Sequence, residues 1–242
     1  MRARRRCSRV TIKAVGFDLG ETLICYRDVP LSWQSLYGEA LAEVAARCGL
    51  MLTAADAETG ERALARHNTR LHPRVEEVTA AEVLGDVLAA WGLSRGAHLE
   101  AAESAFFGYF QRQAAPYDDV TPALEDLRAR GVAIGVLTDV PYGMSRDYVQ
   151  HDLRSLSSYV DALVTSVEAG RRKPDPAGYL ALARALGVDV GEMLYVGNEK
   201  KDIEGANRAG LRSVLLDRDG TGRDYGQAVT IRSLCTVKDL LA

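Results

Sequence analysis

The chain has 242 residues, of which 47% are apolar, and its 30 basic and 33 acidic side chains give a net charge of -3. This length suits one large α/β domain or a domain with a sizeable insert, and the charge balance predicts neither a nucleic-acid nor a membrane-surface partner. Cys7, Cys25, Cys48 and Cys235 form no CxxC pair, so we expect reduced thiols in a cytoplasmic protein, without a zinc site or a disulfide framework.

The chain opens with a basic segment that contains Arg2, Arg4, Arg5, Arg6 and Arg9. The apolar segment 10–17 follows it directly. Because this segment is rich in β-branched residues and contains Lys13, it predicts a core strand and not the apolar part of a secretion signal. The arginine-rich segment is therefore interpreted as a disordered tail.

The strand predicted over residues 10–17 ends at Phe17-Asp18-Leu19-Gly20-Glu21-Thr22. A carboxylate at the end of a strand, followed by glycine and threonine, is presented as a nucleophile. Such a carboxylate attacks phosphorus, or a carbon with a leaving group, and water then cleaves the covalent intermediate. We expect Thr22 and the backbone amides from Gly20 to Glu21 to bind anionic oxygens.

Residues 27–115 carry helical patterns and no strand pattern. The predicted helices are 31–48, 54–71, 80–91 and 97–113. We interpret 27–115 as an all-helical cap domain inserted after strand one, over a core made of 1–26 and 116–242. A solvated polar face is the preferred interpretation of several polar residues of the cap, and a place facing the site is the alternative. These candidates are Arg27, Tyr37, His67, Arg70, His72 and Arg74. Trp33, Phe106 and Phe107 are predicted to be buried in the cap.

The rest of the chain alternates between helices and short apolar strands. Helices are predicted at 122–130, with Thr121 as the N-cap, at 176–186, with Asp175 as the N-cap, and at 202–209. Strands are predicted at 132–137, 162–165, 193–196, 213–216 and 228–231. This alternation predicts an α/β fold with a parallel sheet covered by helices on both faces, where ligands bind at the carboxyl ends of the strands.

Three further motifs fall at those strand ends. Thr138 closes the strand predicted over 132–137, and its hydroxyl is a donor for a phosphoryl oxygen. Lys173 precedes a helix and supplies a charge that neutralises phosphate and keeps Asp18 ionised. The segment that follows strand 193–196 contains Asn198, Glu199 and Asp202, whose oxygens suit Mg²⁺.

These four motifs, taken in order, resemble those of the haloacid dehalogenase-like (HAD) hydrolase superfamily. The resemblance implies a Rossmann-like core with a helical cap of the C1 type, and hydrolysis of a small phosphorylated substrate through an aspartyl-phosphate. The catalytic residues it implies are Asp18, Thr138 and Lys173. The substrate-binding residues are Gly20, Glu21, Thr22 and Asp139. The implied Mg²⁺ ligands are Asp18, the carbonyl of Gly20, Asn198, Glu199 and Asp202. A monomer or a homodimer fits this interpretation.

Two positions depart from the pattern of the superfamily. Gly20 stands where its phosphatases have a second aspartate, which protonates the leaving group and then activates water. Positioned acid–base groups accelerate reactions by roughly 10²–10⁴-fold, so we expect a slow enzyme, or one that uses Glu21, Glu199 or Asp139 instead. Asn198 replaces an aspartate and removes one anionic metal ligand.

Three other functions were weighed against a phosphatase. A 2-haloacid dehalogenase also lacks an aspartate at the Gly20 position. A phosphonatase needs a cap lysine, and residues 14–172 contain no lysine, so that activity is rejected. A non-hydrolytic binding protein would explain both Gly20 and Asn198.

Overall fold

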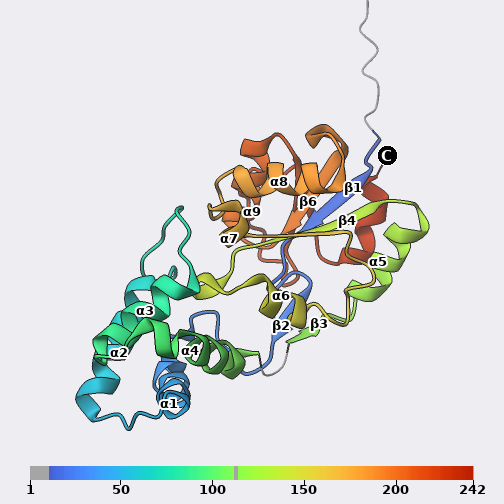
Figure 1. Ribbon diagram of the computed structural model, residues 1–242. Helices are drawn as coiled ribbons and strands as arrows, with labels where there is room; N and C mark the ends of the chain where they lie inside the picture. The colour runs from blue at the N-terminus through green and yellow to red at the C-terminus, as the bar shows by residue number, and fades with distance from the viewer. Residues whose placement is uncertain (1–10, 112–113, 242) are drawn as a thin grey trace, which may run out of the picture.

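The computed structural model describes residues 11–111 and 114–241 (Figure 1). Its core is a six-stranded parallel sheet with the strand order β5-β4-β1-β6-β7-β8. The strands are β1 (Ala14–Phe17), β4 (Ala133–Thr138), β5 (Ala162–Thr165), β6 (Met193–Gly197), β7 (Arg212–Leu216) and β8 (Val229–Ile231). The predicted α/β fold with a Rossmann-like parallel sheet is confirmed. The basic segment at the start of the chain lies outside the described residues.

Helices cover both faces of the sheet, because successive strand residues point to opposite sides. One face carries α8 (Ala177–Leu186) and α9 (Lys200–Ala209), which bury Leu137 and Tyr195. The other face carries α5 (Val120–Ala129) and the 3₁₀ helix η4 (Leu234–Leu240), which pack together and bury Val15 and Val136.

Helix α8 lies close to the sheet because two strand residues have no side chain. A Cβ atom on Gly16 would lie 2.9 Å from Cδ2 of Leu182, and one on Gly135 would lie 2.8 Å from Cδ1 of the same leucine. Both distances are shorter than carbon atoms tolerate. These glycines therefore fix the spacing between α8 and the central strands β1 and β4, whose carboxyl ends hold Asp18 and Thr138.

A helical insert, residues 33–110, stands beside the core (Figure 1). It consists of the 3₁₀ helix η1 (Trp33–Leu36), α1 (Tyr37–Arg47), α2 (Ala54–His67), α3 (Ala80–Ala90) and α4 (Arg95–Phe110). A short antiparallel ribbon of β2 (Ile24–Tyr26) and β3 (Ala114–Pro116) carries the chain into the insert and back. The sequence predicted no strands here, because three-residue strands are too short to show alternation. The domain boundaries at residues 27 and 115 remain a prediction.

Several helix boundaries differ from the prediction. The helix predicted over 31–48 is split into η1 and α1, and α5 begins two residues early, so that Asp119 and not Thr121 precedes it. Asp175 caps the first turn of α8 by accepting a hydrogen bond from the amide of Ala177 (2.9 Å), although the helix itself follows Pro176. The helix predicted over 54–71 ends four residues early, at His67, where Asn68 has an extended conformation.

Five short elements of the core were not predicted. They are η2 (Pro141–Gly143), α6 (Arg146–Asp152), α7 (Ser166–Ala169), η3 (Val190–Glu192) and η4 (Leu234–Leu240). Each is too short to show a helical period. None of the helices within the described ranges is both long enough and apolar enough to cross a membrane.

Candidate active site

Asp18 lies at the carboxyl end of β1 and is 8% exposed. The ammonium group of Lys173, which is itself buried, donates a hydrogen bond to Oδ1 of Asp18 (2.5 Å) and another to Oδ1 of Asp202 (2.7 Å). Lys173 follows α7 in the chain, and Asp202 lies in the first turn of α9. Three distant segments thus bring two carboxylates and one ammonium group together at one edge of the sheet.

The charge states of this pair follow from burial and from one another. Burial raises the pKa of Asp18 to about 6, and the charge on Lys173 opposes that rise. Burial also favours the neutral form of Lys173, but the carboxylates of Asp18 and Asp202 outweigh it and raise the pKa of the lysine well above its ordinary value. Lys173 therefore stays cationic at neutral pH beside a carboxylate that is ionised above about pH 6.

Asp202 is fully buried and organises the loop after β6. Its Oδ2 atom accepts hydrogen bonds from the backbone amides of Asn198 (3.1 Å) and Glu199 (2.9 Å), while Oδ1 accepts from Lys173. A carboxylate in the first turn of a helix is the usual partner for such free amides. Asp202 therefore holds both the loop and the lysine in place.

The turn after β1 connects Asp18 to this loop. The hydroxyl of Thr22 lies 3.4 Å from Oδ2 of Asp18 and donates a hydrogen bond to Oδ1 of Asn198 (3.2 Å). Gly20 lines the cavity beside Asp18, and a Cβ atom built on it would meet nothing within 4 Å. The first predicted motif and the fourth are thus in direct contact.

The side chains of Tyr117 and Arg218, which the sequence analysis missed, support this turn. Glu21 has a positive φ of 58°, and its carboxylate accepts a hydrogen bond from the hydroxyl of Tyr117 (2.5 Å). Arg218 lies over the ring of Tyr117 (4.2 Å) and donates to the carbonyl of Thr22 (2.9 Å). A cation just after β7, at the same sheet edge, was a signal that could have identified Arg218.

Lys201 is a further residue to which the sequence analysis gave no role. Its ammonium group lies 3.1 Å from a carboxylate oxygen of Asp139 and 3.1 Å from one of Glu199. Arg70, from the segment after α2, donates to the second oxygen of Glu199 (2.6 Å). Burial acts against ionised acids here, but the neighbouring cations outweigh it and lower the pKa of both Asp139 and Glu199.

The oxygen atoms near Asp18 decide whether the site suits a magnesium ion. Oδ2 of Asp18 and the amide oxygen of Asn198 both lie within 3.4 Å of the Thr22 hydroxyl, so they are close together. Carboxylate, amide and carbonyl oxygens are the ligands that Mg²⁺ takes, together with several waters, so the oxygens of Asp18 and Asn198 and the predicted carbonyl ligand of Gly20 suit this ion by type. Within the described residues, no group of three or more His, Cys, Asp or Glu side chains is placed to hold a metal.

The other two predicted metal ligands are engaged elsewhere. Both oxygens of Glu199 pair with Arg70 or Lys201, and both oxygens of Asp202 accept hydrogen bonds. Metal binding by either side chain stays a prediction. Both oxygens of Asp18 also accept hydrogen bonds, from Lys173 and Thr22, so Mg²⁺ would replace existing contacts at each of the predicted carboxylate ligands.

A cavity of about 180 Å³ opens beside Asp18. Thr138, at the end of β4, lines it together with Asp139, and the insert contributes His67 and Arg70. Trp33 also lines the cavity, although the sequence predicted only a core role for it. Phe106 and Phe107 are fully buried in the insert, as expected.

The fold and the site together define an α/β protein with an aspartate, a lysine and two hydroxyl groups at the carboxyl edge of a parallel sheet. A sequence model described as haloacid dehalogenase-like hydrolase matches residues 12–210. The chain belongs to this family.

Curated relatives match about half of the chain. A protein named Phosphatase MT3486 from Mycobacterium tuberculosis is 40% identical over 124 residues, which is 51% of this chain and 56% of that protein. A phosphoglycolate phosphatase from Cereibacter sphaeroides is 37% identical over 135 residues, or 54% of this chain and 60% of the relative. Because the matches span little more than half of each relative, they do not by themselves assign an activity.

Solved structures match the chain over nearly its whole length. A HAD phosphatase from Thermococcus onnurineus has a TM-score of 0.65 and 22% identity and covers 96% of this chain and 98% of that one. A 2-haloacid dehalogenase from Pseudomonas syringae has a TM-score of 0.68 and 25% identity and covers 95% and 98%. The fold, with its helical insert, is therefore one that both kinds of protein use.

Proposed function

We propose that this protein hydrolyses the phosphate monoester of a small metabolite, with Asp18 as the nucleophile. The observation that carries the proposal is the position of Asp18, which is held by Lys173 at 2.5 Å and lines a cavity together with Thr138. A cation beside the carboxylate compensates the charge of a phosphate, which would otherwise repel the nucleophile. The curated relatives named as phosphatases support this choice.

The proposed reaction has two steps. An oxygen of Asp18 attacks phosphorus, the ester P–O bond breaks, and the departing alkoxide takes up a proton. Water then attacks phosphorus in the aspartyl-phosphate, which releases inorganic phosphate and restores the carboxylate. Lys173 and the hydroxyl of Thr138 bind the phosphoryl oxygens throughout.

A divalent ion completes the proposed site. Asp18, the carbonyl of Gly20 and Asn198 would hold Mg²⁺, which supplies positive charge for the phosphoryl oxygens. Asp202 contributes by fixing Lys173 and the loop that carries Asn198.

None of the acids that the sequence analysis offered in place of the missing aspartate is placed to protonate the departing alkoxide. Gly20 has no side chain, Glu21 is bonded to Tyr117, and nearby cations lower the pKa of Asp139 and Glu199 so that both stay ionised. An ionised carboxylate cannot give a proton to the leaving group. We therefore expect slow turnover of alkyl phosphates and faster turnover of esters whose leaving group needs no proton.

The direct test is phosphate release from p-nitrophenyl phosphate, whose leaving group departs without protonation. We expect activity with Mg²⁺, loss of activity with a chelator, and a fall of at least about 10³-fold for Asp18→Asn, because the nucleophile is removed. Asp126→Asn, an acid in a partly exposed pair with Lys238, is the matched control and should retain the rate. Equal rates for Asp18→Asn and the wild type would contradict the proposal.

Dehalogenation is the second candidate, and specific observations favour it. Gly20 and Asn198 both depart from the phosphatase pattern, and the 2-haloacid dehalogenase matches the chain with a TM-score of 0.68. Release of halide from a 2-haloacid without added metal, combined with no phosphate release, would support this activity. If neither product forms, a non-hydrolytic binding protein is the remaining choice.

A further inference from the structure

The cavity beside Asp18 has an apolar part as well as a polar one. We use the name aromatic wall for the three aromatic side chains of this part and three apolar ones beside them, which are Tyr26, Trp33 and Tyr142 with Val29, Leu31 and Pro141. Residues 26–33 of the wall belong to the segment that leads from the core into the insert, and the others belong to η2 of the core. The rings of the wall line the same cavity as the nucleophile, so the part of a substrate that is not phosphate meets them.

The rings of the aromatic wall are held in place by packing. The ring of Trp33 stacks on Phe110 with centroids 3.7 Å apart and an interplanar angle of 11°. Tyr142 stacks on the same indole at 5.5 Å. Side chains fixed by packing in this way are preorganised, because the rings need not be reordered when a ligand binds.

The polar atoms of this region already have partners within the protein. The hydroxyl of Tyr26 donates to Asp152 (2.5 Å), and the hydroxyls of Tyr37 and Tyr142 share a hydrogen bond (2.5 Å). The amide nitrogen of Asn68, which lines the cavity, donates to Tyr37 (2.9 Å) and to Ser32 (3.2 Å). A substrate hydroxyl placed here would have to compete with these bonds.

The charged side chains of the cavity are paired in the same way. Arg70 and Lys201 both bind Glu199, and Arg172 donates to Glu77 (2.5 Å) and to the carbonyl of Val140 (2.7 Å). A second acidic group on the substrate would therefore meet cations whose charge the acids of the protein already balance. The cavity therefore favours an uncharged leaving group.

We propose that the substrate is a phosphate monoester of a small apolar alcohol that contains a ring. This inference rests on the proposed function and names the class of its leaving group. The cavity of about 180 Å³ is smaller than the roughly 300–1,000 Å³ of drug-sized sites, so the alcohol is small. Each hydroxyl buried without a partner would weaken binding by roughly 5- to 150-fold, which selects against sugars.

The test compares four esters of primary alcohols, so that the leaving oxygen has similar chemistry in each. They are benzyl phosphate, cyclohexylmethyl phosphate, glucose 6-phosphate and phosphoglycolate. We expect the kcat/KM of the first two to exceed that of the last two by at least about tenfold, which corresponds to about 1.4 kcal/mol. A kcat/KM for glucose 6-phosphate or phosphoglycolate that equals or exceeds that of benzyl phosphate would overturn the inference.

Two variants assign the preference to the wall. Trp33→Ala removes the stacked ring but also part of the insert core. Leu31→Ser avoids that risk, because Leu31 is 65% exposed. We expect both to lower the ratio of kcat/KM for benzyl phosphate to that for glucose 6-phosphate by at least about threefold. Met51→Ser, at a residue of the insert that is 93% exposed, should leave the ratio unchanged. An unchanged ratio in Leu31→Ser would place the preference elsewhere.

A binding measurement separates this inference from the proposed function. Calorimetry with benzylphosphonate, 3,4-dihydroxybutylphosphonate and inorganic phosphate needs no turnover. If no ester is hydrolysed but benzylphosphonate binds at least about tenfold more tightly than the other two, the aromatic wall has the proposed role and the hydrolytic function fails. If the three bind equally, the wall does not select an apolar group, whatever the hydrolytic activity.

Discussion

Gly20 is the residue on which the rate of the proposed reaction depends most. It lines the cavity beside Asp18, and a Cβ atom built on it would meet no residue within 4 Å other than its two neighbours in the chain. Its φ angle is not among the positive ones, so a side chain is accommodated without backbone strain. The position can therefore receive the acid that the resemblance to the superfamily leads one to expect.

The substitution Gly20→Asp should raise kcat on an alkyl phosphate by about 10²–10⁴-fold, because a positioned acid supplies the missing proton. Steady-state kinetics with benzyl phosphate would measure the change. Gly20→Asn is the matched control, since it has the same shape and cannot transfer a proton. Equal rates for the aspartate and asparagine variants would show that another group already protonates the leaving alkoxide.

A second prediction concerns the pH at which the Asp18 carboxyl group loses its proton. Because burial raises its pKa to about 6 from the ordinary 3.8, Asp18 is protonated below that pH and cannot attack phosphorus. In ¹³C NMR of labelled protein without divalent ions, the carboxyl signal that Asp18→Asn removes should titrate with a midpoint near 6. Mg²⁺ should lower that midpoint, since a bound cation stabilises the carboxylate. A midpoint at the ordinary value in the metal-free protein would contradict this.

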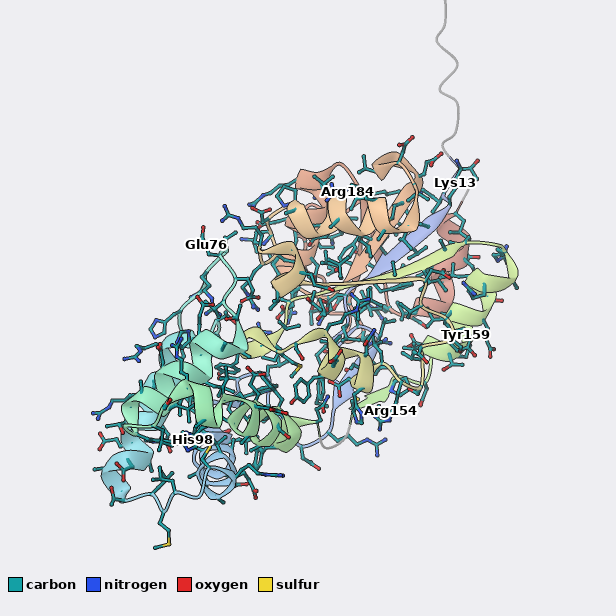
Figure 2. All side chains as sticks on the ribbon, in the orientation of Figure 1. Lys13, Glu76, His98, Arg154, Tyr159 and Arg184 are labelled. Carbon is teal, nitrogen blue, oxygen red and sulfur yellow. The ribbon has the colours of Figure 1, made fainter. Side chains whose placement is uncertain are left out.

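The connection between α2 and α3, residues 68–79, joins the helical insert to the core near Lys173. Glu77 is the buried anchor: it accepts hydrogen bonds from Arg172 (2.5 Å) and from Ser166 (2.5 Å). The amide of Arg172 also donates to the carbonyl of Val75 (2.7 Å). One residue along the chain, Glu76 pairs with Arg171 on the surface, where Figure 2 labels it.

These neighbouring glutamates provide a matched pair for measuring the connection. Glu77→Ala leaves Arg172 buried without its carboxylate and should reduce the free energy of unfolding by about 3–5 kcal/mol. Glu76→Ala removes an exposed ion pair and should cost about 0–1 kcal/mol. Urea unfolding of the two variants would measure both values. Similar losses from the two substitutions would show that the buried pair does not anchor the insert.

At the scale of the whole molecule, the parallel sheet was predictable because short apolar segments alternate with capped helices. The ribbon of β2 and β3 and the short helix α6 were not, since they are too brief to show a period. In the site, Asp18 and Thr138 were predicted because each lies at the end of a strand, and Lys173 because it precedes a helix. The link from Lys201 through Glu199 to Arg70 could not be, because it joins α9 to the insert and depends on tertiary packing.

The most direct test of the whole account is the mass of the protein during turnover. Acid quenching in the presence of substrate and Mg²⁺, followed by peptide mass spectrometry, should detect one phosphoryl group on the peptide that contains Asp18. The same peptide from Asp18→Asn should carry none. Release of inorganic phosphate at the wild-type rate by Asp18→Asn, or a phosphoryl group on any other residue of the wild type, would contradict the central claim that Asp18 is the nucleophile.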